Sequence, residues 1–315
     1  MLTAAIEALH VQHPGRFLTD VRTPCPALFE HSPYITPLMD AEARHIECHY
    51  PLIQQSNQLP YHFIHGYVRH LAGQLGIFLE PAAFRGNIHL HSAELAAPSL
   101  VRTLTGSEEP YWIVCAGGKY DFTIKWWHRR RWQEVIDHFH GRLRFVQTGE
   151  KGHYHPPLQN VVDVRGATTL RELLLLVYHA AGVLCPVTLL MHLAAAVPTG
   201  GGLRPCVVVA GGREPPHWEA YPGHRFLHTV GALPCCSNGG CWRARTVPVG
   251  DNAENDAPAR LCLRPQPSGL PECMEMIEPR HVIDAIEWHC RPGKPDTQPI
   301  YSSTRHESER RATYS

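Results

Sequence analysis

Two lysines follow a glycine turn at the end of an apolar segment. The segment YWIVCAGG at residues 111–118 ends in two glycines, Lys119 comes next, and Lys125 lies in TIKWW. Either ammonium group is placed to bind a phosphate, because a positive charge stabilises the negative charge of a phosphate group. An ordinary solvated lysine is the alternative for each one alone. The prediction of phosphate binding therefore depends on neighbouring segments.

Three further polar side chains stand at comparable positions. Thr188 opens the segment TLLMHLAAAV, a helix whose first N–H groups and positive dipole end form an anion site. His192 lies four residues later and therefore on the same helix face. Glu150 follows Gly149 after another apolar segment, where a carboxylate can accept hydrogen bonds from a ribose or sugar hydroxyl. A helix cap, a packed histidine and a surface glutamate are the alternatives for these three residues.

Apolar strands and amphipathic helices alternate through the second half of the chain, which predicts an α/β fold with a doubly wound parallel sheet. In such sheets a ligand lies outside the carboxyl ends of the strands, where the turns CAGGK, QTGEKG, CPVT and AGGREP fall. The expected strands are YWIVCAGG, RLRFVQTG, GVLCPV and RPCVVVAGG, and the expected helices are RRWQEVIDHF, LRELLLLVYHA and TLLMHLAAAV.

The first half of the chain has a weaker pattern. Residues 2–11 place apolar side chains at helical spacing, and a His-Pro-Gly turn follows, which predicts a helix, a turn and then a strand in FLTDVRTPC. PYHFIHGYVRHLAGQLGI predicts another helix. Gly, Pro, Ser and Thr recur through residues 85–107, which is typical of a connector between domains. We therefore predict a first domain at residues 1–104 and a second at residues 105–230.

Composition limits the class of protein. The 315 residues are 43% apolar, enough for packed cores, and 29 basic side chains balance 29 acidic ones. Zero net charge gives no reason to expect nucleic acid as a partner. No apolar run is long enough to span a membrane and no signal peptide is evident, so a cytoplasmic protein is expected. The 23 histidines are scattered along the chain, which argues against metal storage.

Residues 231–290 break the alternation and gather cysteines into an irregular lobe closed by the helix HVIDAIEWHC. Thiolates bind zinc and iron, so a structural Fe or Zn ion is expected here, and reduced cysteines in a compact lobe are the alternative. Residues 291–315 are polar and without periodicity, which predicts a disordered tail. The predicted metal ligands are Cys236, Cys241, Cys262 and Cys273, with Cys235 as the exchange candidate.

Several of these segments resemble one known family. GGKYDFTIKWWHRRRW resembles the K-x-W segment of the family 9 glycosyltransferases, the bacterial ADP-heptose heptosyltransferases. QTGEKGH is similar to that family's glutamate at a strand end, and TLLMHLAAAVP to its threonine and histidine at a helix start. The segments occur in the family's order over about residues 1–230. The cysteine lobe looks like a variant of the iron finger of the autotransporter heptosyltransferases, a subgroup that glycosylates protein hydroxyls.

The resemblance implies a GT-B fold, with two Rossmann-like domains and the acceptor on the side of the first. It also implies inverting transfer of a heptose or similar sugar from an ADP-heptose-like donor to a lipopolysaccharide core or a protein. No metal is needed for transfer, and the protein is expected to be peripheral at the inner membrane face. Carried over by position, Lys125 binds the donor diphosphate with Lys119 nearby, Glu150 binds the ribose, and Thr188 and His192 bind the diphosphate region.

Two departures from the family put activity in question. The family's D-T-G-x-x-H pattern has Val187 and Leu189 at its aspartate and glycine positions here. The family also begins with a strand and a Gly-Asp loop that holds the proposed base, whereas Met1 falls within the helix that follows. A hydroxyl acceptor needs a base within hydrogen-bond reach. Asp121, between the two lysines, is the preferred replacement, and Asp20 and His65 are the others.

Two readings of another class stay open on the sequence alone. One is a protein that binds nucleotide sugars without transferring them, consistent with the departures above. The other is a metal-dependent regulatory module centred on the cysteine lobe. Transfer assays separate the first from an enzyme, and nucleotide binding that persists after loss of metal counts against the second.

Overall fold

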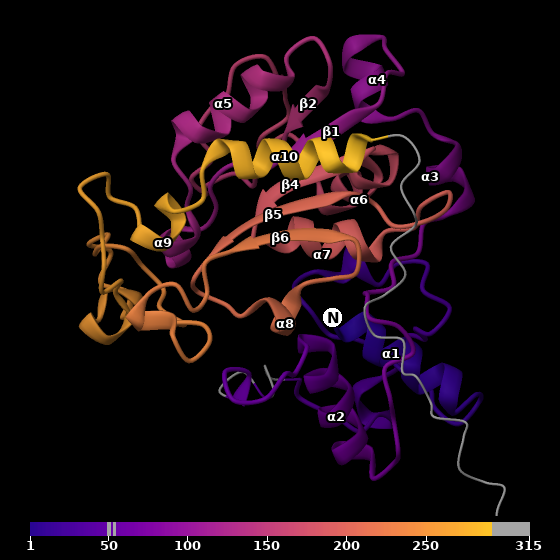
Figure 1. The fold of residues 1–315 in the computed structure, drawn as a ribbon. Helices are drawn as coiled ribbons and strands as arrows, with labels where there is room; N and C mark the ends of the chain where they lie inside the picture. Colours follow the sequence, from indigo (N-terminus) through magenta and orange to yellow (C-terminus); the bar gives the residue numbers. More distant parts are fainter. Residues whose placement is uncertain (49–51, 53–54, 292–315) are drawn as a thin grey trace, which may run out of the picture.

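A six-stranded parallel sheet organises the molecule, and the computed structural model describes residues 1–48, 52 and 55–291. The expected tail lies, except for Arg291, outside the described residues. Strand order is β3-β2-β1-β4-β5-β6, with every pair parallel, so the predicted doubly wound sheet is confirmed (Figure 1). The strands are β1 Tyr111–Val114, β2 Arg144–Gln147, β3 Val162–Asp163, β4 Gly182–Pro186, β5 Cys206–Gly211 and β6 His224–His228.

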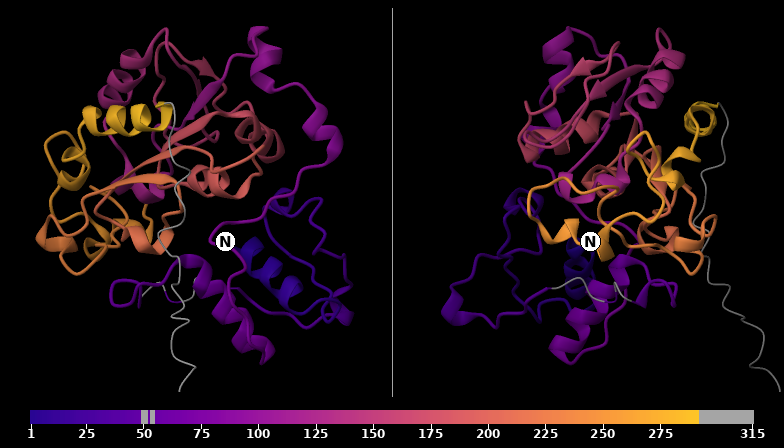
Figure 2. Two further views of the ribbon diagram at one scale, coloured as in Figure 1. Left: turned by 45° about the vertical axis from the view of Figure 1, so that its right-hand side comes forward. Right: turned by 90° about the vertical axis from the view of Figure 1, so that its left-hand side faces the viewer.

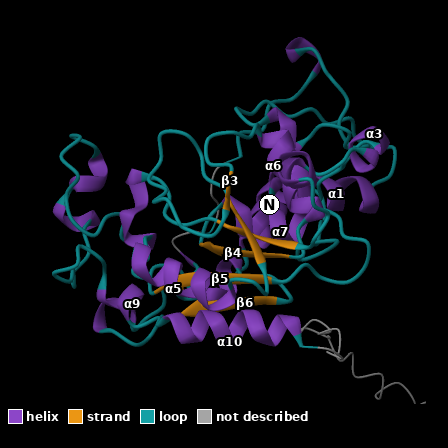
Figure 3. Ribbon diagram, turned by 90° about the horizontal axis from the view of Figure 1, so that it is seen from above, coloured by secondary structure: helices purple, strands orange, loops and turns teal. Residues whose placement is uncertain are grey.

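Helices cover both faces of this sheet, as Figures 1 and 3 show. Successive strand residues point to opposite faces, so Trp112 and Val114 of β1 pack in one core and Ile113 in the other. The first core is covered by α5 and α10, and the second by α6 and α7. Their bounds are α5 Arg129–Phe139, α6 Leu170–His179, α7 Leu189–Ala196 and α10 Pro279–Cys290.

The region before β1 is helical. Helix α1 Leu2–Gln12 packs against α2 Phe63–Leu75, and both share the core of the α6 and α7 face. The strand expected at FLTDVRTPC is not formed, and the part of residues 1–110 that the structure describes has no strand. An extended segment becomes a strand only with a partner for its backbone N–H and C=O groups, and FLTDVRTPC has no ladder partner among the described residues.

A connector joins this region to the sheet through α3 Ser92–Ala96 and α4 Leu100–Thr105, which run along one side of the molecule (Figure 2). Arg171 of α6 holds it in place: its guanidinium donates to both carboxylate oxygens of Glu94, at 2.5 and 2.6 Å. It also donates to the carbonyl oxygens of Ala27 and His89. One charged side chain thus ties three segments of the first region to the sheet.

The cysteine-containing lobe spans residues 231–278 and consists of turns, short 3-10 helices and α9 Glu272–Glu275. Arg245, with no exposed surface, donates to Asp251 at 2.7 Å and Asp256 at 2.5 Å. It also donates to the carbonyl oxygen of Tyr120, which attaches the lobe to the segment after β1.

Among the described residues, no helix is long and apolar enough to cross a membrane.

Candidate functional site

The candidate site lies at the carboxyl ends of β1 and β4, where the chain's direction of winding reverses. Two glycines follow β1, and Gly117 has φ of +94°, a region that favours glycine. A Cβ there would lie 2.0 Å from the carbonyl oxygen of Tyr154. Gly118 and Tyr154 exchange two backbone hydrogen bonds, at 2.8 and 3.1 Å. This turn opens the crevice in which nucleotides bind in such folds.

Lys125 reaches this crevice from η4, a 3-10 segment at Tyr120–Lys125. Its Nζ lies 2.9 Å from Oε1 of Glu214 and 3.5 Å from the carbonyl oxygen of Val187 after β4. Burial lowers the pKa of Lys125 to about 7, the charge of Arg213 adds to this, and Glu219 opposes it. Lys125 is therefore a desolvated ammonium beside a helix N-terminus, suited to a diphosphate.

Thr188 and His192 stand at the same place. Thr188 is the N-cap of α7, and its hydroxyl accepts from the backbone N–H of Leu190 at 3.4 Å. Nδ1 of His192 lies 2.9 Å from the hydroxyl of Tyr221. Burial holds the pKa of His192 well below its usual value, and nearby positive charges, including Lys125, act in the same direction. His192 is thus a neutral imidazole that can donate or accept a hydrogen bond.

The other predicted site residues are exposed. Lys119 and Glu150 are not buried, and Oε2 of Glu150 is 3.3 Å from Nδ1 of His153. Asp121 is 56% exposed and lies 3.8 Å from Arg245, which orients it to the lobe. The structure brings together Lys125, Thr188 and His192, and their roles stay predictions.

The alternative bases have structural partners. Asp20 accepts from the backbone N–H groups of Val21 and Leu38 and from Arg22. Nδ1 of His65 accepts from the backbone of His62 in the capping box of α2. Each of the three bases considered from sequence therefore has a structural partner, and its role as a base stays a prediction.

Sequence reasoning missed three charged residues of this site. Arg213 and Glu214 follow β5 directly and form a buried ion pair, and Glu219 ends the short helix α8 Pro216–Glu219. Oε2 of Glu219 lies 3.9 Å from Nε2 of His192. The segment AGGREPPHWEA could have predicted them. Its charged residues follow a buried strand, and the ends of parallel strands lie at the same sheet edge as Thr188.

The lobe forms one wall of this site. The backbone N–H groups of Cys241 and Trp242 donate to the carbonyl oxygens of Gly212 and Arg213, at 3.2 and 3.1 Å. A Cβ on Gly240 would lie 2.1 Å from the carbonyl oxygen of Arg213, so the lobe's backbone abuts the turn after β5. The position of Glu214, the partner of Lys125, therefore depends on the lobe.

Asn57 links the first region to the same part of the lobe. Its amide donates to the carbonyl oxygen of Gly240 at 2.8 Å and accepts from that residue's N–H at 3.0 Å. The indole N–H of Trp242 donates to the same amide oxygen at 2.6 Å. Trp242 also packs edge-on against Trp218 of α8, whose ring lies 4.4 Å from that of Phe63. We call this contact the Asn57 junction.

Five cysteines of the lobe line one cavity of about 10 Å³, the size of a single water-sized sphere. Burial raises the pKa of four of these thiols, those of Cys235, Cys241, Cys262 and Cys273. The pKa of Cys273 is raised to about 12. The thiol of Cys236 is turned to the carbonyl oxygens of Leu233 and Thr229, at 3.4 and 3.6 Å. The five are Cys235, Cys236, Cys241, Cys262 and Cys273.

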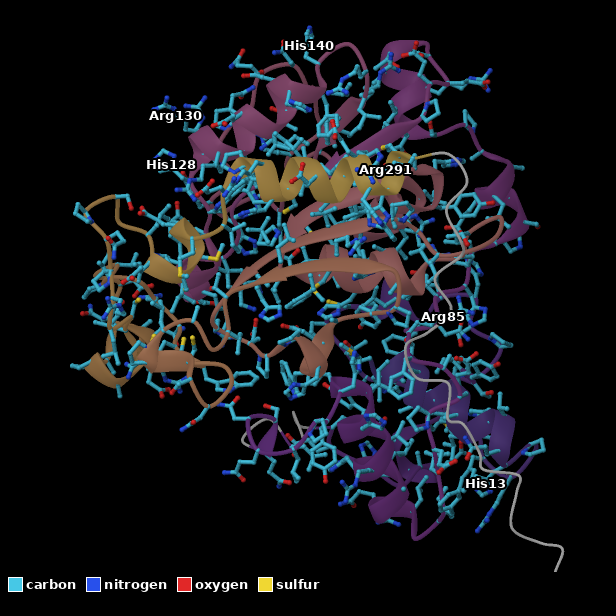
Figure 4. All side chains as sticks on the ribbon, in the orientation of Figure 1. His13, Arg85, His128, Arg130, His140 and Arg291 are labelled. Carbon is cyan, nitrogen blue, oxygen red and sulfur yellow. The ribbon has the colours of Figure 1, made fainter. Side chains whose placement is uncertain are left out.

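This cavity has the chemistry of a thiolate site without its geometry. Four sulfur ligands suit zinc or iron. Within residues 1–48, 52 and 55–291, however, no group of three or more His, Cys, Asp or Glu side chains is arranged to hold a metal ion. His128 and His140, labelled in Figure 4 with Arg130, lie on the outer surface at the two ends of α5.

The sheet order and the glycine turn at its switch point define a Rossmann-like fold. Residues 79–221 match the family model "Glycosyltransferase family 9 (heptosyltransferase)". The resemblance inferred from the sequence is thus confirmed. No curated protein sequence matches the chain.

Solved structures agree in fold. The iron-containing dodecameric glycosyltransferase TibC from enterotoxigenic E. coli H10407 is similar with a TM-score of 0.56 and 18% identity, over 91% of this chain and 71% of TibC. This likeness and the parallel sheet confirm the predicted GT-B class of α/β fold.

Two other structures are similar at lower scores. The family 9 glycosyltransferase from Veillonella parvula DSM 2008 has a TM-score of 0.49 and 15% identity, over 72% of this chain. E. coli ADP-heptose lps heptosyltransferase II has a TM-score of 0.46 and 14% identity, also over 72% of this chain. The chain spans 59% and 61% of their lengths.

Proposed function

We propose that this protein is an inverting glycosyltransferase that transfers a heptose or similar sugar from an ADP-heptose-like donor to a lipopolysaccharide core or a protein hydroxyl. Its match to the family 9 model supports the reaction class. The donor diphosphate lies against the start of α7, where Thr188 and His192 bind it together with Lys125. Glu150, after β2, binds the ribose, and Lys119, after β1, is a further ligand of the donor.

The observation that carries this proposal is the position of Lys125. A desolvated ammonium 3.5 Å from the carbonyl oxygen of Val187 and beside the N-terminus of α7 makes an anion site. Its present partner, Glu214, holds it in place, and the sugar diphosphate then shares the ammonium. The arrangement stabilises the leaving nucleoside diphosphate without a metal ion.

We further propose that the lobe holds a structural Fe or Zn ion. The ligand set is Cys236, Cys241, Cys262 and Cys273, with Cys235 as the exchange candidate. The shared cavity of these thiols supports the proposal, as does the similarity in fold to TibC, an iron-containing glycosyltransferase. The thiols must lose their protons and turn toward the cavity on binding, so uptake releases protons and weakens at low pH.

A second function of another class is binding of the nucleotide sugar without transfer. The observation that favours it is that Asp121, Asp20 and His65 all have partners outside the crevice. Donor binding needs none of them, whereas deprotonation of an acceptor hydroxyl needs a base.

Release of ADP from ADP-heptose tests the proposal, measured by chromatography with and without a lipopolysaccharide core acceptor or a hydroxyl peptide. Acceptor-dependent release supports transfer, and donor binding without release supports the second function. Thr188→Ala lowers kcat/KM by about tenfold through its lost diphosphate contact.

Thr169→Ala is the matched control, because Thr169 is also a helix N-cap but opens α6, which follows the edge strand β3. Both substitutions remove a cap of similar stabilising effect. Equal losses of kcat/KM in the two variants contradict the assignment of Thr188.

A further inference from the structure

The site contains a buried carboxylate whose partner the described residues do not supply. The side chain of Glu219 is 4% exposed, and its Oε1 has no hydrogen-bond partner there. Nε2 of His192 lies 3.9 Å from its Oε2, which is too far for a hydrogen bond. A buried carboxylate without hydrogen bonds is costly, so such a group is retained where a ligand completes it.

Burial raises the pKa of Glu219, and the charges of Lys125 and Arg213 act against this, but the described residues give Glu219 no hydrogen-bonded cation. His192 is held neutral by its buried position, and the ammonium of Lys125 is paired with Glu214. Arg213 is paired with Glu214 as well and donates to the carbonyl oxygen of Arg243. Both cations are therefore paired with Glu214, and Oε1 of Glu219 is left without a hydrogen-bond donor among the described residues.

The place of Glu219 indicates which part of a donor reaches it. It ends α8, which lies between the sheet and helices α1 and α2 in Figure 1. Trp218, the preceding residue, packs on Phe63 of α2, and Tyr221 lies against His62. With the diphosphate proposed at Thr188 and His192, the donor's sugar is the next group within reach of Glu219, which lies 3.9 Å from His192.

The chemistry of the carboxylate excludes the other parts of the donor. A carboxylate repels a diphosphate, and the phosphate groups are already bound by Lys125 and the start of α7 in the proposed function. Sugar hydroxyls are neutral donors, and a carboxylate accepts two of them at once. Two adjacent hydroxyl groups on a sugar ring match its two oxygens.

We propose that Glu219 accepts hydrogen bonds from hydroxyl groups of the transferred sugar and so selects the sugar of the donor. This inference rests on the proposed function, because it assumes a nucleotide sugar at the strand ends. Glu219 acts as a specificity residue here, and it takes no proton from the acceptor.

Calorimetric titration of two ligands tests this role. ADP and ADP-heptose are titrated into the wild type, into Glu219→Gln and into Glu134→Gln, a control on the exposed side of α5. Affinity of Glu219→Gln for ADP-heptose falls by about tenfold or more, since the lost hydrogen bonds involve a charged acceptor. Its affinity for ADP stays within about twofold of the wild type, and the control changes neither value.

Other results overturn the inference. Equal weakening of ADP and ADP-heptose shows that Glu219 acts through Lys125. Unchanged affinities with lost ADP release identify it instead as the base. If Glu219→Gln does not fold, Glu219→Asp takes its place. Its affinity for ADP-heptose must also fall while its affinity for ADP is retained. Absence of ADP binding by the wild type removes the proposed function itself, which is distinguishable from all of these.

Discussion

The sheet and the lobe meet at the candidate site but hold their shape in different ways. The sheet is held by parallel ladders and two apolar cores. The lobe, residues 231–278, is held by turns, the ion pairs of Arg245 and the packing of its cysteines. One region therefore supplies a fixed anion site, while the other positions the turn that carries Glu214. The predictions below separate these contributions, from the largest expected effect to the smallest.

Arg204 tests how strongly buried hydrogen bonds outside the lobe stabilise the sheet and its helices. Its buried guanidinium donates to carbonyl oxygens at the ends of α6 and α7, among them Ala194 at 3.2 Å and Val197 at 3.0 Å. Arg204→Ala leaves these carbonyls unpaired and lowers the free energy of unfolding by about 3 kcal/mol, measured by denaturant titration. Arg142→Ala is the control, because Arg142 donates to one carbonyl at the exposed end of α5. Equal losses contradict the account.

Cys262 tests the lobe. Cys262→Ser removes one thiolate and lowers metal affinity by about fiftyfold, measured by elemental analysis after dialysis against a chelator. Cys25→Ser is the control, since Cys25 is exposed in the first region. Full metal content in Cys262→Ser, or no metal in the wild type, would sink the proposed metal site.

The Asn57 junction tests whether the two regions communicate. Asn57→Ala removes three hydrogen bonds that connect the first region to Gly240 and Trp242. The turn after β5 then loosens, and affinity for ADP falls by about tenfold, measured by calorimetry. Asn160→Ala, which removes a bond to Asp137 on α5, should leave affinity unchanged. An effect on stability without one on affinity would mean that the junction is only structural.

The pH dependence of ADP binding gives the smallest effect. The ammonium of Lys125 is charged below its pKa of about 7 and neutral above it, so the group that attracts the diphosphate is lost as pH rises. Affinity falls by about fivefold between pH 7 and pH 8, where the phosphates are already ionised. Glu214, Glu219, Arg213 and His192 face Lys125, and Lys125→Ala should abolish the trend. A rise in affinity with pH would contradict this assignment.

Sequence patterns predicted the sheet well because its information is local. The apolar run RPCVVVAGG predicts a strand and the periodic segment RRWQEVIDHF predicts a helix, each from its own residues alone. The glycines indicate where the strands end. The strand β6, at HRFLH, was missed because an edge strand that is only half buried has no continuous apolar run. The two-residue strand β3 is too short for any pattern.

The site was predicted in part, for a physical reason. Lys125, Thr188 and His192 lie at or near element ends, which sequence spacing identifies. Asp121 stands between the two lysines in the sequence, yet the η4 turn directs it to Arg245, and no spacing rule contains that information. Glu219 and Asn57 depend on contacts across the whole chain, so only the folded structure places them.

The most direct test is calorimetric titration of ADP into the wild type, Lys125→Ala and Lys151→Ala. Lys151 is an exposed lysine after β2 and serves as the matched control. A diphosphate bound at the start of α7 loses its charged partner in Lys125→Ala, so affinity should fall by about a hundredfold while Lys151→Ala retains it. Equal affinity in all three proteins would contradict the account.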